Sequence, residues 1–266
     1  MLAKPMQCLF ERDGLPRFGL PPLLAEAYGG DFGLARPLLY ANFVASADGV
    51  VALPVATESG GMISGQSEVD RFLMGLLRAV ADAILIGAGT FRAGAGDRWL
   101  PEAAFPAAAE HFAGLRARLG LRSHPLLVVV SASGQLDTAQ PALRDCLILT
   151  TARGEARLRG KLPPGARTAV LEAPRFGGRA WLDLLHAQGL RTILTEGGPT
   201  LFGQLLDAGL VDELFLTTSP RLFGRRVNDD RKSLVEGVSL LASPLELLSV
   251  RRHDSHLFLR YALAKP

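Results

Sequence analysis

Short apolar runs alternate with amphipathic stretches along most of this chain, and turn residues separate them. Runs rich in Val, Ile and Leu predict strands, and apolar positions that recur every three or four residues predict helices. Strands are expected over residues 38–45, 83–86, 126–131, 146–151, 167–171, 192–195, 211–219, 245–252 and 257–263. Helices are expected over residues 69–81, 107–119, 180–188 and 199–208, with a short one over 23–28. This order predicts an α/β fold, with a central, mostly parallel sheet flanked by helices and antiparallel C-terminal strands.

The first 36 residues have a different pattern from the rest of the chain. They hold Pro16, Pro21-Pro22 and Gly29-Gly30, and they offer only the short helix at 23–28. We expect residues 1–36 to form an N-terminal arm packed on the main domain, and residues 37–266 to form that domain.

Composition narrows the class of protein. With 266 residues, 48% of them hydrophobic, the chain can bury a large core. No apolar run approaches the roughly 20 residues of a membrane span, and the start lacks a secretory signal, so we expect a cytoplasmic protein with no membrane partner. The net charge of +3 is dispersed and aromatic residues make up only 7%. That pattern argues against nucleic-acid binding and suits a small anionic ligand.

One strand ends in a glycine turn that is suited to an anionic group. The run 192–195 stops at Gly197-Gly198, and a helix pattern starts at Pro199. Glycines let a ligand approach the backbone, proline suits the first position of a helix, and the free amides of that turn attract anions. Glu196 opens the turn, and we assign it a sugar hydroxyl or a substrate NH group. A plain tight connection is the alternative interpretation.

A second strand ends in the same way. The run 83–86 leads into Gly87, Gly89 and Thr90. Two such turns in one chain indicate two sides of one cofactor cleft. A polar, small-residue segment starting at Ser131 follows the strand 126–131 and either receives a 2′-phosphate or is only a turn.

A glycine-rich loop is expected over 58–64, and polar residues between it and the predicted helix 69–81, or on that helix, are further candidates. Ser67 is a suitable N-cap with Asp70 at the third helical position, where the helix dipole favours a carboxylate. Asp70 is therefore either a capping residue or a ligand for the ring NH groups of a pyrimidine or pteridine. A buried Arg78 needs a partner, and a substrate phosphate would serve. Asn42, in an apolar strand, either ties the sheet to a loop or faces the pocket.

Several catalytic signatures are absent from the sequence. It contains no Gly-x-Ser-x-Gly, no Walker lysine loop and no His-Glu-x-x-His, and neither of its two cysteines has a metal-ligand spacing. We therefore expect no metal site. Chemistry must then come from a bound cofactor, and hydride transfer from a nicotinamide fits this requirement.

An ordered set of motifs resembles a known family. These motifs are Asn42 with Ser46 to Gly49, Ser59 to Ser64, Leu77 to Thr90, Thr195 to Leu201, Val211 to Leu214, and Ser219 to Gly224. Together they resemble the 5-amino-6-(5-phosphoribosylamino)uracil reductases of bacterial riboflavin biosynthesis, which have a dihydrofolate-reductase-like fold. The likeness is to stand-alone reductases, because the His-x-Glu and Pro-Cys-x-x-Cys of the fused zinc deaminase are absent.

The resemblance implies an NADPH-dependent reductase that transfers hydride to C1′ of the ribosyl group and gives a ribitylamino product. It implies that Asp70 and Glu196 are catalytic. The implied cofactor contacts are Ala45, Gly87, Gly89, Thr90, Ser131, Gly197, Gly198, Pro199, Thr200 and Leu201. The implied substrate contacts, beside the two acids, are Asn42, Gly60, Ser64 and Arg78.

Two other functions remain open. An acid such as Asp70 would also bind a pteridine, which would make the protein a dihydrofolate or dihydropteridine reductase with the same fold and cofactor. The segment after Thr90 departs from the family pattern, so a non-catalytic dimeric nucleotide-binding protein is the third candidate. Family likeness also leads us to expect a homodimer, with the C-terminal strands and the 1–36 arm as contacts.

Overall fold

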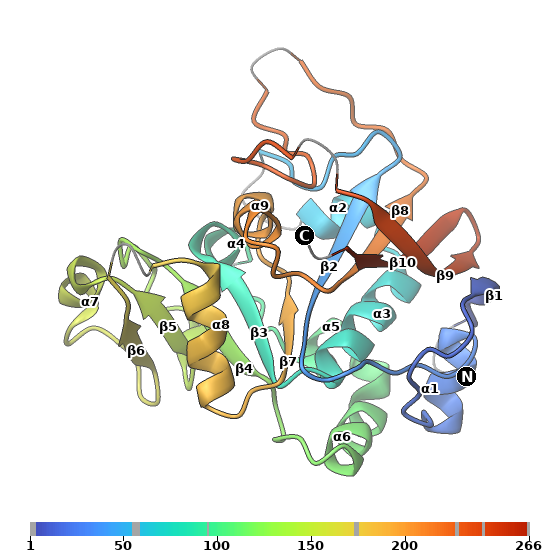
Figure 1. Ribbon diagram of the computed structural model, residues 1–266, viewed down its shortest axis with the longest axis horizontal. Helices are drawn as coiled ribbons and strands as arrows, with labels where there is room; N and C mark the ends of the chain where they lie inside the picture. The colour runs from blue at the N-terminus through green and yellow to red at the C-terminus, as the bar shows by residue number, and fades with distance from the viewer. Residues whose placement is uncertain are drawn as a thin grey trace.

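A ten-stranded sheet forms the centre of the molecule (Figure 1), in the order β1-β9-β10-β8-β2-β7-β3-β4-β5-β6. The computed structural model describes residues 4–54, 59–94, 96–172, 176–226, 229–240 and 243–264. The strands are β1 Gln7–Glu11, β2 Leu38–Ser46, β3 Ala83–Gly87, β4 Leu126–Val130, β5 Leu147–Thr150, β6 Arg167–Val170, β7 Thr192–Thr195, β8 Glu213–Ser219, β9 Leu245–His253 and β10 His256–Leu263. Neighbours from β8 to β6 pair in parallel, and β10, β9 and β1 add antiparallel pairs. The expected mixed sheet is confirmed.

Helices cover both faces of the sheet. They are α1 Pro22–Tyr28, α2 Ser59–Ser64, α3 Glu68–Ala79, α4 Ala88–Ala93, α5 Pro101–Ala104, α6 Ala109–Arg118, α7 Ala152–Leu158, α8 Gly178–Ala187 and α9 Pro199–Asp207, with 3₁₀ turns at Pro106–Ala108 and Pro141–Leu143. One buried cluster includes Leu76 of α3 and Phe112 of α6. The other includes Trp181 of α8 and Leu205 of α9. Because both faces are covered, β4, β5 and β7 are buried along their whole length.

The first 36 residues contribute to the sheet as well as lying beside it. β1 pairs with β9 at one sheet edge, and α1 lies next to it (Figure 1). Two buried arginines hold this segment. Arg251 donates to the Tyr28 carbonyl at 2.9 Å and pairs with Glu11. Arg260 donates to the Gly33 carbonyl at 3.0 Å and pairs with Glu213 at 2.7 Å.

Three local predictions differ from the structure. The segment 58–64 was expected to be a glycine-rich loop, but Ser59–Ser64 is the helix α2, while Glu58 lies outside the described residues. Gly89 and Thr90 belong to the first turn of α4 rather than to a loop, with Gly87 at its N-cap. α7 was not expected at all. Glycine-rich and very short helices give little periodic signal, so tertiary packing decides them.

Among the described residues, no helix has the length and apolar character needed to cross a membrane.

Candidate active site

Four adjacent parallel strands end at the same edge of the sheet. β2, β7, β3 and β4 are neighbours in that order, and their carboxyl ends lie toward α2, α4 and α9 in Figure 1. The residues that follow or end these strands are therefore brought together: Ala45 on β2, Glu196 to Leu201 after β7, Gly87 to Thr90 after β3, and Ser131 after β4. Ligands of open α/β sheets bind at such an edge.

The two glycine turns lie against each other. A Cβ added to Gly198 would lie 3.0 Å from the Thr90 Oγ1 atom, and one on Gly87 would lie 3.7 Å from Leu201. The Thr195 hydroxyl donates to the Leu85 carbonyl at 3.0 Å, and it accepts from the Gly197 amide at 3.2 Å. α9 starts at Pro199 without a side-chain cap, so its first amides stay available to a ligand.

Arg78 was expected to meet a substrate phosphate, and its partners in the structure are carboxylates. Its Nε donates to Glu196 Oε1 at 2.9 Å, and its Nη2 donates to Glu196 Oε2 at 2.7 Å. On its other side Nη2 donates to Asp97 Oδ2 at 3.1 Å and Nη1 to the Leu100 carbonyl at 3.3 Å. The arginine is only 1% exposed. Burial alone lowers the pKa of Arg78, but the charges of Glu196 and Asp97 more than offset it and raise that pKa.

Asp70 occupies the third position of α3, as its spacing from Ser67 predicts. The Ser67 side chain caps the helix by accepting from the Asp70 amide at 3.3 Å. Burial raises the pKa of the Asp70 carboxyl to about 6; the Thr217 hydroxyl and His256 act in the opposite direction, while the charge of Glu196 adds to the rise. Asp70 can therefore hold or release a proton near neutral pH.

The predicted substrate contacts lie on β2 and α2. Asn42 is half-buried on β2, opposite Phe215 of β8. Ser64 is buried at the end of α2, and its carbonyl accepts a 2.9 Å hydrogen bond from the His256 Nε2 atom. Gly60 is exposed, and a Cβ there would meet open space. This side of the site is thus formed by β2, β8, α2 and the β9–β10 turn.

Two hydroxyl groups at this edge lack partners. Within the part of the chain that the structure describes, the side-chain oxygens of Ser131 and Ser219 are buried and have no hydrogen-bond partner. Ser131 follows β4 and Ser219 ends β8, so they lie on the two flanks of the strand set. Buried hydroxyls are nearly always paired, so these two groups lack the partner that is usual for such positions.

Family comparison agrees with this architecture. The family model of the RibD C-terminal domain matches residues 37–259. The chain belongs to the RibD C-terminal domain family.

Individual relatives within the RibD family extend this comparison. The chain is 28% identical over 210 residues to the 2,5-diamino-6-ribosylamino-4(3H)-pyrimidinone 5′-phosphate reductase of Archaeoglobus fulgidus, covering 77% of this chain and 89% of that protein. It is 30% identical over 194 residues to the riboflavin biosynthesis protein RibD of Escherichia coli, covering 71% of this chain but only 49% of that protein. A pyrimidine reductase-like protein from Corynebacterium diphtheriae has the same fold, with a TM-score of 0.68, 23% identity and coverage of 93% and 96% of the two chains.

The structure adds site residues that sequence reasoning missed in this RibD-family chain. Asp97, Thr217, Ser219 and His256 all lie at the site, and the only sequence signals were an acid in a turn and polar residues near strand ends. Asp48 accepts from the Phe223 and Gly224 amides and so holds the segment after β8.

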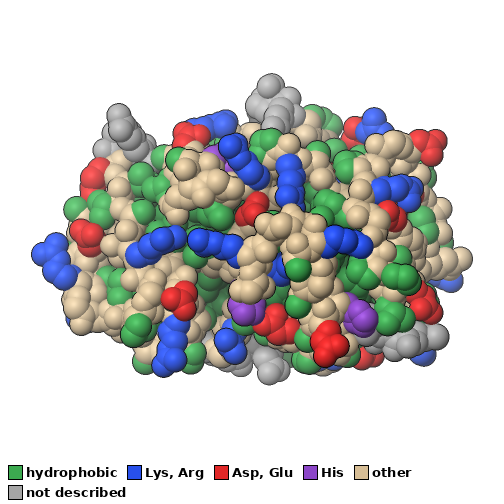
Figure 2. Space-filling view, turned by 90° about the horizontal axis from the view of Figure 1, so that it is seen from below, with side chains coloured by type: hydrophobic (Ala, Val, Ile, Leu, Met, Phe, Trp, Pro, Cys, Tyr) green, Lys and Arg blue, Asp and Glu red, His purple; other side chains and the backbone are tan. Residues whose placement is uncertain are grey.

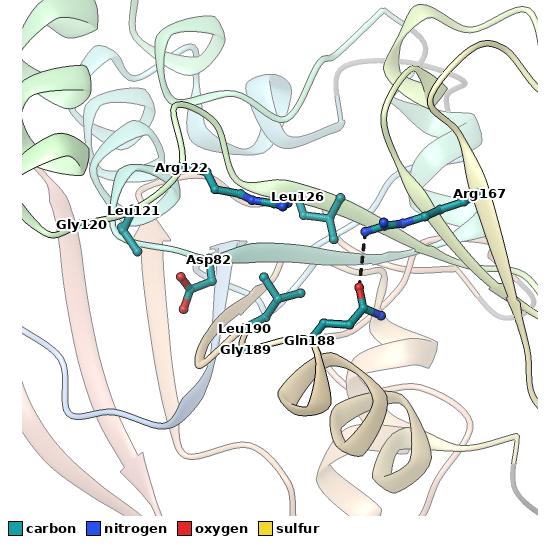
Figure 3. Close-up of a pocket in the computed structure, with 9 residues that line it drawn as sticks. All are labelled: Asp82, Gly120, Leu121, Arg122, Leu126, Arg167, Gln188, Gly189 and Leu190. Carbon is teal, nitrogen blue, oxygen red and sulfur yellow. Dashed lines mark hydrogen bonds between the residues drawn. The ribbon is translucent and has the colours of Figure 1, made fainter.

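A cavity lies at the end of the sheet opposite the candidate site. It has a volume of about 390 Å³ and is lined by Asp82, Gly120, Leu121, Arg122, Leu126, Arg167, Gln188, Gly189 and Leu190 (Figure 3). It contains none of the predicted site residues. Figure 2 shows the underside of the view in Figure 1, where basic side chains are interspersed with acidic ones. Among the described residues no group of His, Cys, Asp and Glu is suited to hold a metal ion.

Proposed function

We propose that this protein is an NADPH-dependent reductase of a ribosylaminopyrimidine 5′-phosphate in riboflavin biosynthesis. Hydride is delivered to C1′ of the ring-opened ribose, and the product is a ribitylamino compound. The observation that carries the proposal is that two contacting glycine turns meet two carboxyl groups, Glu196 and Asp70, at one sheet edge of a RibD-family fold. Membership of this family supports a nicotinamide cofactor.

The residues at this sheet edge are suited to NADPH. The uncapped start of α9 offers amides to a phosphate, and the unpaired Ser131 hydroxyl offers a contact at the far side of the turns. Gly89 is exposed, so the backbone there is open to a ligand. A bound nicotinamide supplies the hydride, while the protein supplies binding and orientation.

Glu196 and Asp70 have different roles in the proposed reaction. Glu196 faces the guanidinium of Arg78 through both carboxylate oxygens, so we assign it to accept hydrogen bonds from a substrate NH or hydroxyl group. Asp70, with a pKa of about 6, is assigned to give a proton to the nitrogen of the imine. Hydride addition at C1′ and a proton at nitrogen together convert the C=N bond to CH–NH.

Two pyrimidines are candidate substrates. The family resemblance favours the deaminated 5-amino-6-(5-phosphoribosylamino)uracil. The Archaeoglobus relative and another from Methanothermobacter thermautotrophicus, 26% identical over 217 residues, are named for the 2,5-diamino compound. The alternative from a different family is dihydrofolate, because a carboxyl such as Asp70 also suits a pteridine.

The test is the loss of NADPH absorbance with purified protein and each of these three compounds in parallel. We expect turnover with one or both pyrimidines and none with dihydrofolate. Turnover with dihydrofolate alone would show that the protein is a pterin reductase instead. Saturable NADPH binding without turnover of any of the three compounds would contradict the proposal.

The acids are tested with the same assay. We expect Asp70→Asn and Glu196→Gln each to lower kcat by about 10²-fold or more, with NADPH affinity changed less than about threefold. Asp183→Asn, an exposed carboxylate on α8, is the matched control. Unchanged turnover in both site variants would contradict the assignment of the acids.

A further inference from the structure

A second place suited to a ligand lies at the end of the sheet opposite the candidate active site. The cavity of about 390 Å³ in Figure 3 lies where strands β3, β4 and β6 begin, beside the end of α8. The residues of the candidate active site follow the other ends of β3 and β4. Sites for small molecules commonly have volumes of roughly 300–1,000 Å³. The cavity is therefore large enough for a small organic ligand, and it is separate from the reductase site.

Two arginines border this cavity. Arg122 follows α6 and Arg167 begins β6, and Figure 3 shows their guanidinium groups on either side of Leu126. Arg167 Nη2 donates to the Gln188 side-chain oxygen at 3.3 Å, which is a neutral partner. Among the residues that the structure describes, neither arginine forms an ion pair with a carboxylate. Both charges are thus available to an anion, and guanidinium groups match the oxygens of a phosphate.

A carboxylate lies at the other side of the cavity. Asp82 directly precedes β3, and Figure 3 shows it on the opposite side of Leu190 from Arg167. Its Oδ2 accepts from the Arg191 and Thr192 amides at 2.9 and 2.7 Å, which fixes the carboxylate against the start of β7. Within the described part of the chain, its Oδ1 has no hydrogen-bond partner. A carboxylate oxygen held in this way can accept a hydrogen bond from an N–H group of a ligand.

Apolar side chains separate the carboxylate from the arginines. Leu126 and Leu190 are 8% and 7% exposed and lie between Asp82 and Arg167 in Figure 3. Leu121, which is half-buried, also lines the cavity. An apolar surface of this kind favours contact with the face of a planar ring. The cavity therefore offers a positive side, an apolar middle and a negative side.

We propose that this cavity binds an organic phosphate monoester whose planar ring carries N–H groups, as in a nucleoside monophosphate. The phosphate lies between Arg122 and Arg167, the ring packs on the leucines, and a ring N–H donates to Asp82 Oδ1. Each guanidinium binds two oxygens, so a phosphate with three terminal oxygens serves two arginines better than a carboxylate does. The site contains no residue of the reductase site and goes beyond the proposed function.

The first test titrates GMP, ribose 5-phosphate and inorganic phosphate into NADPH-saturated protein and follows the backbone amides by NMR. With GMP we expect saturable shifts of the Gly120 and Gly189 amides, which line the cavity, and smaller ones at Gly89 and Gly198. GMP should bind about tenfold or more tightly than ribose 5-phosphate, because only GMP reaches the leucines and Asp82. Shifts confined to Gly89 and Gly198, or equal affinity for all three compounds, would overturn the proposal.

The arginines are tested by removing one charge at a time. Arg122→Gln and Arg167→Gln should each raise the Kd of GMP by about tenfold, since each loses a charge-assisted contact to the phosphate. Arg157→Gln, an exposed arginine on α7 that lies outside the cavity, is the matched control and should leave that Kd unchanged. An unchanged Kd in both cavity variants would contradict the proposal.

Asp82→Asn separates recognition of the ring from binding of the phosphate. Asparagine keeps an oxygen for the Arg191 and Thr192 amides but replaces the other carboxylate oxygen with an NH₂ group. The Kd of GMP should rise by about threefold or more, and that of ribose 5-phosphate should change less than about twofold. Equal losses for the two compounds would show that Asp82 does not contact the ring.

A change of ligand makes the same test on the wild-type protein, in case Asp82→Asn does not fold. Purine riboside 5′-monophosphate has no N–H group on its ring, so it should bind about threefold or more weakly than GMP. Equal affinity would contradict the hydrogen bond to Asp82. These binding measurements do not depend on turnover. A protein that reduces neither pyrimidine but shows the GMP shifts at Gly120 and Gly189 would lose the proposed function and keep this ligand site.

Discussion

At the scale of single residues, the proton on Asp70 links stability to pH. Its pKa of about 6 lies above the ordinary value of 3.8, mainly because of burial. Between about pH 4 and about pH 6 the folded state binds more protons than the unfolded state, so stability falls as pH rises through this window. Above about pH 6, folding must keep the charged Asp70 carboxylate at a partly desolvated, half-buried position.

Asp70→Asn should therefore stabilise the protein at about pH 8 by roughly 1 to 3 kcal/mol and give no such gain near pH 4. Urea unfolding at the two pH values measures the difference. Glu68→Gln, an exposed carboxylate in the same first turn of α3, should lack this pH dependence. An equal gain for Asp70→Asn at both pH values would show that removal of the charge is not its cause.

A substitution at Gly89 can distinguish an effect on NADPH binding from an effect on folding stability. A Cβ at this exposed helical position would meet no atom within 4 Å. Gly89→Ala should therefore keep or raise the free energy of unfolding by up to about 1 kcal/mol. If NADPH lies against this backbone, its Kd should rise about tenfold or more, as measured by fluorescence titration. Gly114→Ala on α6, where the space is equally open, is the control and should leave the Kd for NADPH unchanged. If Gly89→Ala also leaves that Kd unchanged, Gly89 does not contact the cofactor.

The sequence predicted contacts between residues that are close in the chain, but not contacts between residues that are far apart in it. The Ser67 cap and the place of Asp70 followed from a spacing of three. Arg78 and Glu196 are 118 positions apart, so their pairing depends on how β7 and α3 lie in the fold. From spacing alone, a phosphate was as reasonable a partner for a buried arginine as a carboxylate.

At the scale of elements, buried ion pairs hold the C-terminal strands: Arg251 of β9 pairs with Glu11 of β1, and Arg260 of β10 pairs with Glu213 of β8. The Arg260 and Glu213 side chains are 4% and 11% exposed. Glu213→Gln should lower the free energy of unfolding by roughly 3 kcal/mol, because it leaves a buried charge without its partner. The Arg12–Glu246 pair is 50% and 61% exposed, so Glu246→Gln should change stability by less than about 0.5 kcal/mol. Urea denaturation of both variants measures this contrast, and equal effects would contradict it.

Element prediction succeeded where periodic patterns were long. The buried parallel strands and the helices α3, α6, α8 and α9 were expected within a few residues of their bounds. The sequence did not predict α2, which is built on Ser59, Gly60 and Gly61, since glycine weakens the helix signal. A Cβ at Gly61 would lie 2.8 Å from the Gln66 side chain, so close packing favours glycine there.

At the scale of the whole molecule, the antiparallel strands offer a surface for self-association. Leu245, Leu247 and Leu257 on β9 and β10 are 45%, 37% and 36% exposed. We propose that they contribute to a homodimer contact, as family likeness suggests. Light scattering should then give a dimer for wild type, and a monomer of unchanged Tm for Leu257→Asp. Val170→Asp, at the opposite sheet edge, should stay dimeric; a monomeric wild type would contradict the proposal.

The order of strands in the sheet also determines when β1 can find its partner during synthesis. β1 pairs with β9, and Glu11 must wait for Arg251, which follows it by 240 positions. At ribosomal speeds of about 5 to 20 residues per second, that interval is on the order of 10 to 50 s. Throughout it the nascent chain carries an unpaired strand that includes Leu9 and Phe10. β1 is therefore the first strand to be synthesised, but its partner β9 appears only near the end of synthesis. Until then, the unpaired edge of β1 must be kept from pairing with another strand.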